Sequence, residues 1–213
     1  MGAGQNHKEK VTSMPKLLIA TENKGKRREL QELLADLPGI ELIMPSQLGI
    51  TLKVEETGST YAENASLKAS AYCEAGGLVT LADDSGLEVY ALGGAPGIYS
   101  ARYSPKPGAT DADRRAFLLE NLEGKPRPWL AHFHAAIAIA LPGGEIHVVE
   151  GDCPGEIIPE ERGSNGFGYD PIFLLSEHGL TMAELGDVEK NRLSHRARAV
   201  ANAEPILKEI LGI

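Results

Sequence analysis

The chain has 213 residues, of which 42% are hydrophobic and 24% charged, and its formal net charge is -9. These values are typical of a soluble globular protein with one large domain or two small lobes. The acidic balance argues against a long nucleic acid as partner, because proteins that hold phosphate backbones usually carry an excess of Lys and Arg.

The N-terminal segment and the cysteines bear on where the protein works. Residues 1–15 are polar and lack an apolar signal-peptide core, so we expect a disordered tail or an expression remnant. No apolar run approaches the roughly 20 residues needed to cross a membrane. Cys73 and Cys153 are too few for a disulfide framework, which favours a reducing compartment. We therefore expect a cytoplasmic protein that does not bind membranes.

The first half of the chain alternates apolar runs with amphipathic segments. Residues 16–21 predict a buried strand, and leucines at helical spacing predict a helix over 24–37. A capping box that begins at Thr60 predicts a second helix to about residue 74. Further elements are predicted in this order: strands over 78–82 and 87–92 around a turn at 83–86, a loop over 93–107, and a helix over 110–122.

The second half opens with a long apolar strand, predicted over 132–141, whose hairpin partner is expected over 144–149. The remaining predictions are a Gly-rich loop over 161–170, a strand over 172–175, a short helix capped at 181–184, and a last helix from Ser194 to 211 that Pro205 should kink or interrupt. Interleaved strands and helices predict a mixed α/β fold. No linker divides residues 16–213, so we expect a single domain whose two lobes share a continuous sheet.

The first polar turn that holds more functional groups than a connection needs is Thr21-Glu22-Asn23-Lys24-Gly25-Lys26. It lacks the first glycine and the final Ser or Thr of a Walker A loop. It nevertheless offers a hydroxyl, an amide, two ammonium groups and the free backbone N–H groups of a helix N-terminus, which together could hold a phosphate chain. The alternative is a solvated first helical turn.

The second is the acidic turn around Asp83 and Asp84. Adjacent carboxylates are costly to ionise together without a cation nearby, and on a strand or tight turn only one would face a site. Such a carboxylate can bind Mg²⁺ and orient or deprotonate a water molecule. An acidic partner is expected within residues 54–58, which hold Glu55 and Glu56. The alternatives are an Asx-type turn for the aspartates and surface charge for the glutamates.

The third is the loop that ends at Asp170, in which glycines surround Phe167 and Tyr169. Glycines let a backbone approach a flat ligand closely while an aromatic ring stacks on it. Asp170 precedes a proline and is therefore held extended.

The start of the last helix carries Ser194, His195 and Arg196, with Lys190 just upstream. Taken alone, this is an ordinary basic helix start with Ser194 as its N-cap. A Ser-His-Asp hydrolase is not supported, because the chain has no G-x-S-x-G elbow.

His132 and His134 lie on one strand face at a spacing that can bind zinc. No third ligand is evident from spacing, so we expect exposed or core-edge histidines.

Together and in this order, these motifs resemble the inosine-triphosphate pyrophosphatase family over nearly all of residues 16–213. The resemblance is carried by Thr21–Lys26, Glu55–Gly58 with Glu63-Asn64, Ala82–Leu87, Gly93–Arg102, Gly166–Pro171 and Ser194–Arg196. It implies an elongated mixed α/β fold with two lobes around a central substrate cleft, usually a homodimer. It also implies Mg²⁺-dependent hydrolysis of deaminated purine nucleoside triphosphates (ITP, dITP, XTP) to a monophosphate and pyrophosphate, which cleanses the nucleotide pool.

The resemblance also implies roles for residues. Asp84 would be the general base and, with Glu56, a metal ligand. The triphosphate would be held by Thr21, Glu22, Asn23, Lys24, Gly25, Lys26 and Lys68, with Ser85 beside it. The base and nearby groups would be recognised by Phe167, Gly168, Tyr169, Asp170, Lys190, His195 and Arg196.

Selectivity for deaminated purines would depend on the 6-position of the base, where a carbonyl accepts a hydrogen bond and an amino group donates one. Donors such as His195, Arg196 or backbone N–H groups would be unmatched by adenine. Two unmatched buried donors, at about 1–3 kcal/mol each, would give roughly a hundredfold preference. The alternatives are a related pyrophosphatase for modified pyrimidine or methylated nucleotides, and a nucleotide-binding sensor without turnover.

Overall fold

A computed structural model describes residues 14–35 and 37–213 and contains one seven-stranded mixed sheet. Its strand order is β2-β1-β3-β4-β5-β6-β7; β1 is parallel to both of its neighbours and all other pairs are antiparallel. The strands are β1 (Lys16–Ile19), β2 (Glu41–Ile43), β3 (Val79–Val89), β4 (Trp129–Ala140), β5 (Ile146–Ile157), β6 (Phe173–Leu175) and β7 (Leu180–Thr181). The predicted mixed α/β class is therefore confirmed.

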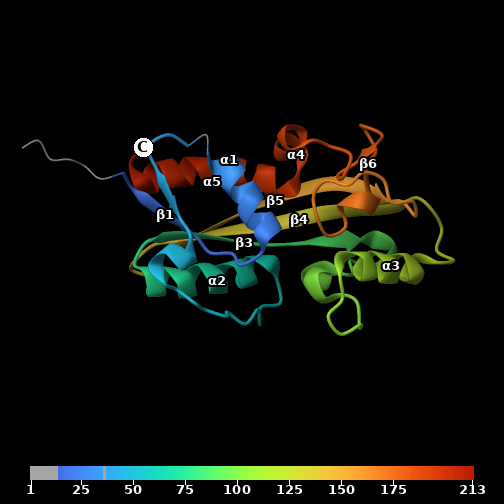
Figure 1. The fold of residues 1–213 in the computed structure, drawn as a ribbon, viewed down its shortest axis with the longest axis horizontal. Coiled ribbons are helices and arrows are strands. Elements are labelled where there is room, and N and C mark those ends of the chain that lie inside the picture. The colour runs from blue at the N-terminus through green and yellow to red at the C-terminus, as the bar shows by residue number, and fades with distance from the viewer. Residues whose placement is uncertain (1–13, 36) are drawn as a thin grey trace, which may run out of the picture.

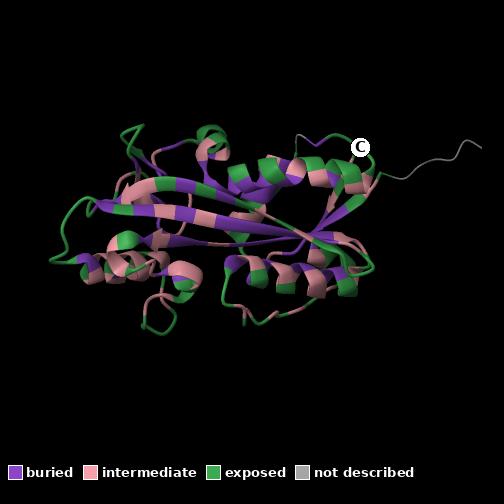
Figure 2. Cartoon of the chain, turned by 180° about the vertical axis from the view of Figure 1, so that it is seen from behind, coloured by how far each residue is buried: buried purple, intermediate pink, exposed green. Residues whose placement is uncertain are grey.

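Helices cover both faces of this sheet (Figure 1). On one face lie α2 (Tyr61–Gly76) and α3 (Asp111–Leu122), and on the other α1 (Lys24–Leu34), α4 (Asp187–Leu193) and α5 (His195–Leu211). Short 3₁₀ turns complete the fold: η1 (Pro45–Leu48), η2 (Tyr90–Leu92), η3 (Gly97–Arg102) and η4 (Asp170–Ile172). The strands β1, β3 and β4 are mostly buried between the two helical layers, whereas β5 and the outer sides of the helices are partly exposed (Figure 2).

The predicted helix starts at Thr60, Thr110 and Ser194 are confirmed by their caps. Each of these side chains accepts a hydrogen bond from the backbone N–H three residues on. Such a bond satisfies one of the donors that a helix start leaves without an intrahelical partner, which is why Ser and Thr mark helix starts. Contrary to the expected interruption, α5 runs through Pro205 as one helix.

The turn predicted at 83–86 is wrong, because β3 is continuous from Val79 to Val89. Every residue from Thr80 to Val89 pairs with β4, so the ladder holds the polar residues in extended conformation. A strand alternates its side chains between faces. Asp83 and Ser85 therefore point toward α1 and α5, while Asp84 points toward α2.

The helix predicted at 181–184 is also wrong. Thr181 belongs to β7, and its backbone N–H donates to the Glu184 carboxylate while the Glu184 N–H donates to the Thr181 carbonyl. The Thr-x-x-Glu pattern therefore closes a turn after a strand, and the helix begins only at Asp187. The hairpin partner predicted over 144–149 is longer than expected and runs to Ile157.

One edge of β3 is left bare where β1 stops. The last pair between the two strands is Ile19 with Leu81, after which the Ala20 N–H donates to the Leu81 carbonyl and the chain turns away. β3 continues for the length of its polar segment with β4 on its other edge only, apart from an isolated bridge between Glu88 and Pro96. This bare edge gives access to side chains on both faces of the sheet.

Two predictions remain, the N-terminal tail and the absence of a membrane-spanning segment. Residues 1–13 of the predicted tail lie outside the described residues. Among the described residues, no helix combines the length and the apolar character needed to cross a membrane.

Candidate functional site

A cavity of about 410 Å³ lies beside the bare edge of β3. Most of the predicted site residues line it, although they come from distant parts of the chain: Thr21, Glu22, Asn23, Lys26, Glu56, Lys68, Asp84, Ser85, Phe167, Gly168, Tyr169, Asp170, Lys190, His195 and Arg196. Lys24 and Gly25 are not in its lining. Lys24 is exposed on the first turn of α1, and Gly25 lies beneath the ring of Phe167.

At one end of the cavity, the ammonium group of Lys68 on α2 joins two carboxylates. Its Nζ lies 3.0 Å from Oδ1 of Asp84 and 3.1 Å from Oε1 of Glu56, and it also donates to the Asp83 carbonyl at 2.8 Å. Arg102 of η3 donates to the other oxygen of Glu56 at 3.1 Å. Oxygens of Asp84 and Glu56 therefore converge within hydrogen-bonding distance of one point.

The carboxylates of this pair differ in their electrostatics. Burial raises the pKa of Asp84 by more than Lys68 and Lys26 lower it. Burial also opposes ionisation of Glu56, yet Lys68 and Arg102 hold its pKa below the usual value. A carboxylate with a raised pKa is a stronger base, so Asp84 is the better proton acceptor of the two.

The turn before α1 is already organised by its own side chains. Oδ1 of Asn23 accepts hydrogen bonds from the N–H groups of Gly25 and Lys26, and the Asn23 N–H donates to the Thr21 hydroxyl. Two of the backbone donors expected to bind an anion are therefore used by the helix cap. The cationic groups that line the cavity are the side chains of Lys26, Lys53, Lys68, Arg114, Lys190 and Arg196.

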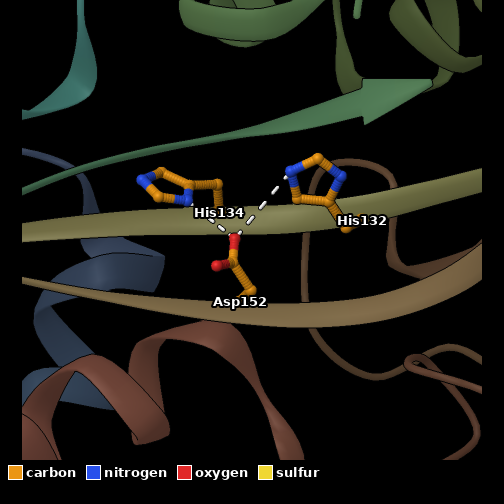
Figure 3. A group of neighbouring side chains, drawn as sticks. All are labelled: His132, His134 and Asp152. Atoms are coloured by element: carbon orange, nitrogen blue, oxygen red, sulfur yellow. Dashed lines mark hydrogen bonds and ion pairs between the residues drawn. The ribbon is translucent and has the colours of Figure 1, made fainter. Parts of the chain in front are cut away.

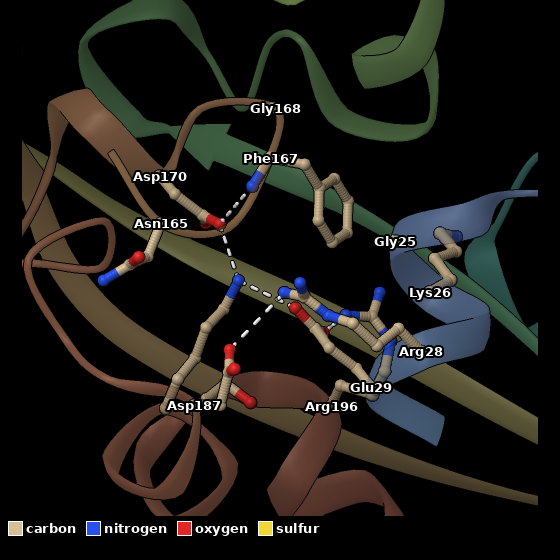
Figure 4. A network of polar contacts seen from close by, with 12 residues as sticks. Gly25, Lys26, Arg28, Glu29, Asn165, Phe167, Gly168, Asp170, Asp187 and Arg196 are labelled. Carbon is tan, nitrogen blue, oxygen red and sulfur yellow. Dashed lines mark hydrogen bonds and ion pairs between the residues drawn. The ribbon is translucent and has the colours of Figure 1, made fainter. Parts of the chain in front are cut away.

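The opposite sheet face carries a buried network of alternating charges around Arg196 (Figure 4). The Arg196 guanidinium donates to Asp83 at 3.2 Å, to Ser85 at 2.9 Å and to Glu29. Lys26 extends the network with an ion pair to Asp83 at 2.8 Å. Asp83 thus anchors two cations that come from α1 and α5.

Lys190 extends the same network toward the aromatic loop. Its Nζ lies 2.7 Å from Glu29 and 2.6 Å from Asp170, whose carboxylate also accepts the Phe167 N–H at 2.9 Å. Burial lowers the pKa of Lys190, but Asp170 and Glu29 raise it above the usual value. These contacts connect Glu29 on α1 to the Phe167 backbone through Lys190 and Asp170. The network therefore fixes the position of the Phe167 loop relative to α1.

The far end of the cavity is aromatic. A Cβ built on Gly25 would lie 2.6 Å from the Phe167 ring, so only glycine lets the ring sit this close to α1. Phe133 stacks on His195 with ring centroids 4.8 Å apart. Burial holds the pKa of His195 well below its usual value, and Nδ1 of this neutral ring has no hydrogen-bond partner among the described residues.

Several residues of the site carry no marker in the sequence. Glu29 is one acidic residue in an amphipathic helix, so the sequence does not single it out. Asp111 lies between Thr110 and Asp113, whose capping box gives this acidic segment a structural explanation. Asp111 accepts the Gly168 N–H at 2.8 Å, and Arg115 donates to the Gly168 carbonyl at 2.8 Å, so α3 holds the aromatic loop from its other side. Arg102 ends the Gly93–Arg102 motif, but its contact with Glu56 is made only by folding.

Comparisons with known proteins find relatives over most of the chain. The model of the Ham1 family matches residues 17–206. A dITP/XTP pyrophosphatase of Desulforamulus reducens is 47% identical over 196 residues, which cover 92% of this chain and 96% of the relative. One from Thermus thermophilus is 48% identical over 188 residues, covering 87% and 88%.

Solved structures give the same result. A HAM1 protein from Coxiella burnetii superposes with a TM-score of 0.83 at 43% identity, covering 92% of this chain and all of the other. A nucleoside-triphosphatase/dITP/XTP pyrophosphatase from Mycobacterium abscessus gives a TM-score of 0.71 at 42% identity, with coverages of 90% and 99%.

Proposed function

The chain belongs to the Ham1 family, and on that basis we propose that it hydrolyses deaminated purine nucleoside triphosphates to a nucleoside monophosphate and pyrophosphate. The observation that carries the proposal is a single cavity whose lining includes both the carboxylate pair and an aromatic wall, where Phe133, opposite Leu87 in the β3–β4 register, stacks on His195. Such a cavity suits a ligand with a polyphosphate chain at one end and a flat base at the other. The activity would keep ITP, dITP and XTP out of DNA and RNA synthesis.

The residues of the carboxylate pair fit Mg²⁺. This ion takes oxygen ligands and is usually bound through one or two carboxylates together with substrate phosphates. Asp84 and Glu56 lie within reach of one point, which the Lys68 ammonium occupies by holding one oxygen of each carboxylate, so Mg²⁺ would bind beside that ammonium. Held by these carboxylates, Mg²⁺ would neutralise phosphate charge at the bond that breaks.

Side chains of the protein supply the proton acceptor and the positive charges that the reaction needs. Lys68 bonds Oδ1 of Asp84, and we assign Oδ2 as the atom that takes the proton of the attacking water. The attack on the α-phosphorus breaks the bond to the bridging oxygen, and pyrophosphate leaves. Lys68 and Lys53 are placed to offset the negative charge of the phosphate chain.

Base recognition is assigned to His195 and the Phe167 loop. His195 is neutral and buried at the cavity wall, so its ring N–H can meet a 6-carbonyl and is left unmatched by the 6-amino group of adenine. Arg196 already donates hydrogen bonds to Asp83, Glu29 and Ser85. Its main contribution to base recognition is therefore to hold the start of the helix that carries His195.

A substrate panel tests the proposal. With Mg²⁺ present, we expect kcat/KM for ITP, dITP and XTP to exceed that for ATP by roughly a hundredfold, because adenine leaves buried donors unpaired. Pyrophosphate, and not orthophosphate, should appear with the monophosphate. Equal turnover of ATP would refute base recognition at His195, and faster turnover of modified pyrimidine or methylated nucleotides would favour a related pyrophosphatase.

Replacing Gly25 with alanine tests the aromatic end of the cavity. The new Cβ would displace the Phe167 ring. Since an aromatic stack contributes about 0.5–1.5 kcal/mol, KM for ITP should rise roughly three- to tenfold. The free energy of unfolding should not fall, because alanine is about 1 kcal/mol better than glycine in a helix.

Gly186→Ala is the matched control, since a Cβ there meets nothing within 4 Å. An unchanged KM in the Gly25→Ala protein would remove Phe167 from the binding site.

Two remaining expectations belong to the proposal. Homodimer formation is expected from the family resemblance, and light scattering of the purified chain measures it directly. The cytoplasm is the expected compartment, where the nucleotide pool is used.

A further inference from the structure

His132 and His134, which the sequence leaves without a third partner, acquire one from the neighbouring strand. The two histidines lie on one face of β4, and β5 places Asp152 directly opposite His134 in the antiparallel register. Nδ1 of His134 lies 2.7 Å from Oδ1 of Asp152, and Nε2 of His132 lies 3.8 Å from the same oxygen. Figure 3 shows the carboxylate between the two rings.

The spacing of the three side chains suits one small cation. One ligand atom from each residue lies within 4.8 Å of the others. Ligands at about 2.0–2.1 Å in a tetrahedral zinc site are separated by about 3.3 Å. The distances of 2.7 Å and 3.8 Å lie on either side of that value, so small side-chain rotations would bring the donors into place.

The surroundings of the rings also resemble those of a metal site. Metal-binding histidines usually direct their second nitrogen to a carboxylate or carbonyl. Nε2 of His134 lies 3.7 Å from Glu150 and fits this pattern. His132 does not share it, because its Nε2 faces both Asp152 and, at 3.6 Å, Glu88, while its Nδ1 is buried without a hydrogen-bond partner among the described residues. Tyr61 and Tyr90 pack against the rings, at centroid distances of 4.9 Å from His134 and 5.5 Å from His132, and so limit their rotation.

We propose that His132, His134 and Asp152 form a binding site for a divalent transition metal of the zinc class, separate from the Mg²⁺ site of the proposed activity. Two imidazoles and one carboxylate suit zinc and similar ions, whereas Mg²⁺ prefers oxygen ligands. None of the three residues is in the lining of the cavity. Three protein ligands leave a fourth position for water, and Asp152 opens it to solvent because its side chain is 58% exposed.

Zinc titration of the untagged, full-length protein tests the site. The titration is followed by calorimetry in excess Mg²⁺, which occupies oxygen-only sites such as Asp84 with Glu56. We expect one equivalent of Zn²⁺ to bind the wild type. The affinity should fall by more than about a hundredfold in His134→Ala and in Asp152→Asn, because losing a direct ligand exceeds the 10- to 100-fold effect of outer-shell changes.

The matched control is His147→Ala. His147 lies on β5 like Asp152, is partly exposed and is paired with a glutamate, Glu145, at 3.1 Å. Its removal should leave zinc affinity unchanged. Co²⁺ provides a second readout, since a four-coordinate Co²⁺ site gives strong visible absorption that only the cluster variants should lose.

Two results would overturn the proposal. Absence of stoichiometric zinc binding in the wild type would reduce the cluster to a hydrogen-bonded His134–Asp152 pair. Equal affinity in His134→Ala and His147→Ala would place the zinc elsewhere. Neither result bears on nucleotide hydrolysis, which the substrate panel measures separately.

Discussion

Replacing Asp84 with asparagine is expected to lower kcat for ITP by about 10²–10⁴-fold, which is the usual contribution of a general base. Asparagine keeps the size of the side chain and can still accept a hydrogen bond from Lys68, but it cannot take a proton. Substrate binding, measured by calorimetry with ITP and Mg²⁺, should weaken far less than turnover. The base is expected at this residue because Asp84 lines the cavity and only one of its two carboxylate oxygens is bonded to Lys68.

Two further variants separate the roles of the carboxylates. Glu56→Gln should raise the Mg²⁺ concentration needed for half-maximal rate, with a smaller loss of kcat than in Asp84→Asn. Asp187→Asn is the control, because Asp187 is exposed and lies outside the cavity lining, with Arg28 at 3.4 Å. Full turnover by Asp84→Asn would exclude it as the general base.

Arg196→Met is expected to reduce the free energy of unfolding by about 3–5 kcal/mol, the usual cost of removing one partner of a buried ion pair. The guanidinium is 1% exposed and bonds Asp83 and Glu29, which are themselves buried. Without it, Lys26 and Lys190 would be the remaining cations beside those two carboxylates. Urea unfolding followed by circular dichroism measures the change.

Lys208→Met provides the matched control on the same helix. Lys208 is about half-exposed and pairs with Glu204 one turn away, so its loss should change stability by no more than about 0.5 kcal/mol. Because a loss of 3–5 kcal/mol is a large part of a typical folding free energy, Arg196→Lys keeps the test usable. That variant retains the charge, loses the forked geometry, and should have intermediate stability. Equal stability of Arg196→Met and the wild type would mean that the network contributes little to folding.

The parts of the fold that local sequence determines could be predicted. Thr60, Thr110 and Ser194 mark helix starts because the side-chain oxygen of each accepts a hydrogen bond from the backbone N–H three residues later. This cap depends only on neighbouring residues. The apolar alternation of β4 likewise depends only on the residues of that strand. These signals need no knowledge of distant residues.

The parts that depend on distant partners could not be predicted. Aspartate, serine and glycine at 83–86 favour a turn, but pairing with β4 and the cations Lys26, Lys68 and Arg196 hold them in a strand. The same reason applies to Asp152, which joins His134 only through the register of β5. The site motifs could be found because they are contiguous, while Glu29 and Asp111 could not, since each acts through a contact made by folding.

The bare edge of β3 has a consequence for the tendency of the protein to aggregate. An uncovered strand edge is a template on which another chain can add a strand, and that addition begins aggregation. The cavity lies beside this edge, along the part of β3 that β1 does not pair with. Natural sheets discourage foreign strands with charges that point inward, and Asp83 and Asp84 lie at this edge as buried carboxylates. Along the same edge the Asp83 carbonyl accepts from Lys68 and the Leu87 N–H donates to the Ser100 hydroxyl, so side chains already occupy part of the ladder that a foreign strand would need.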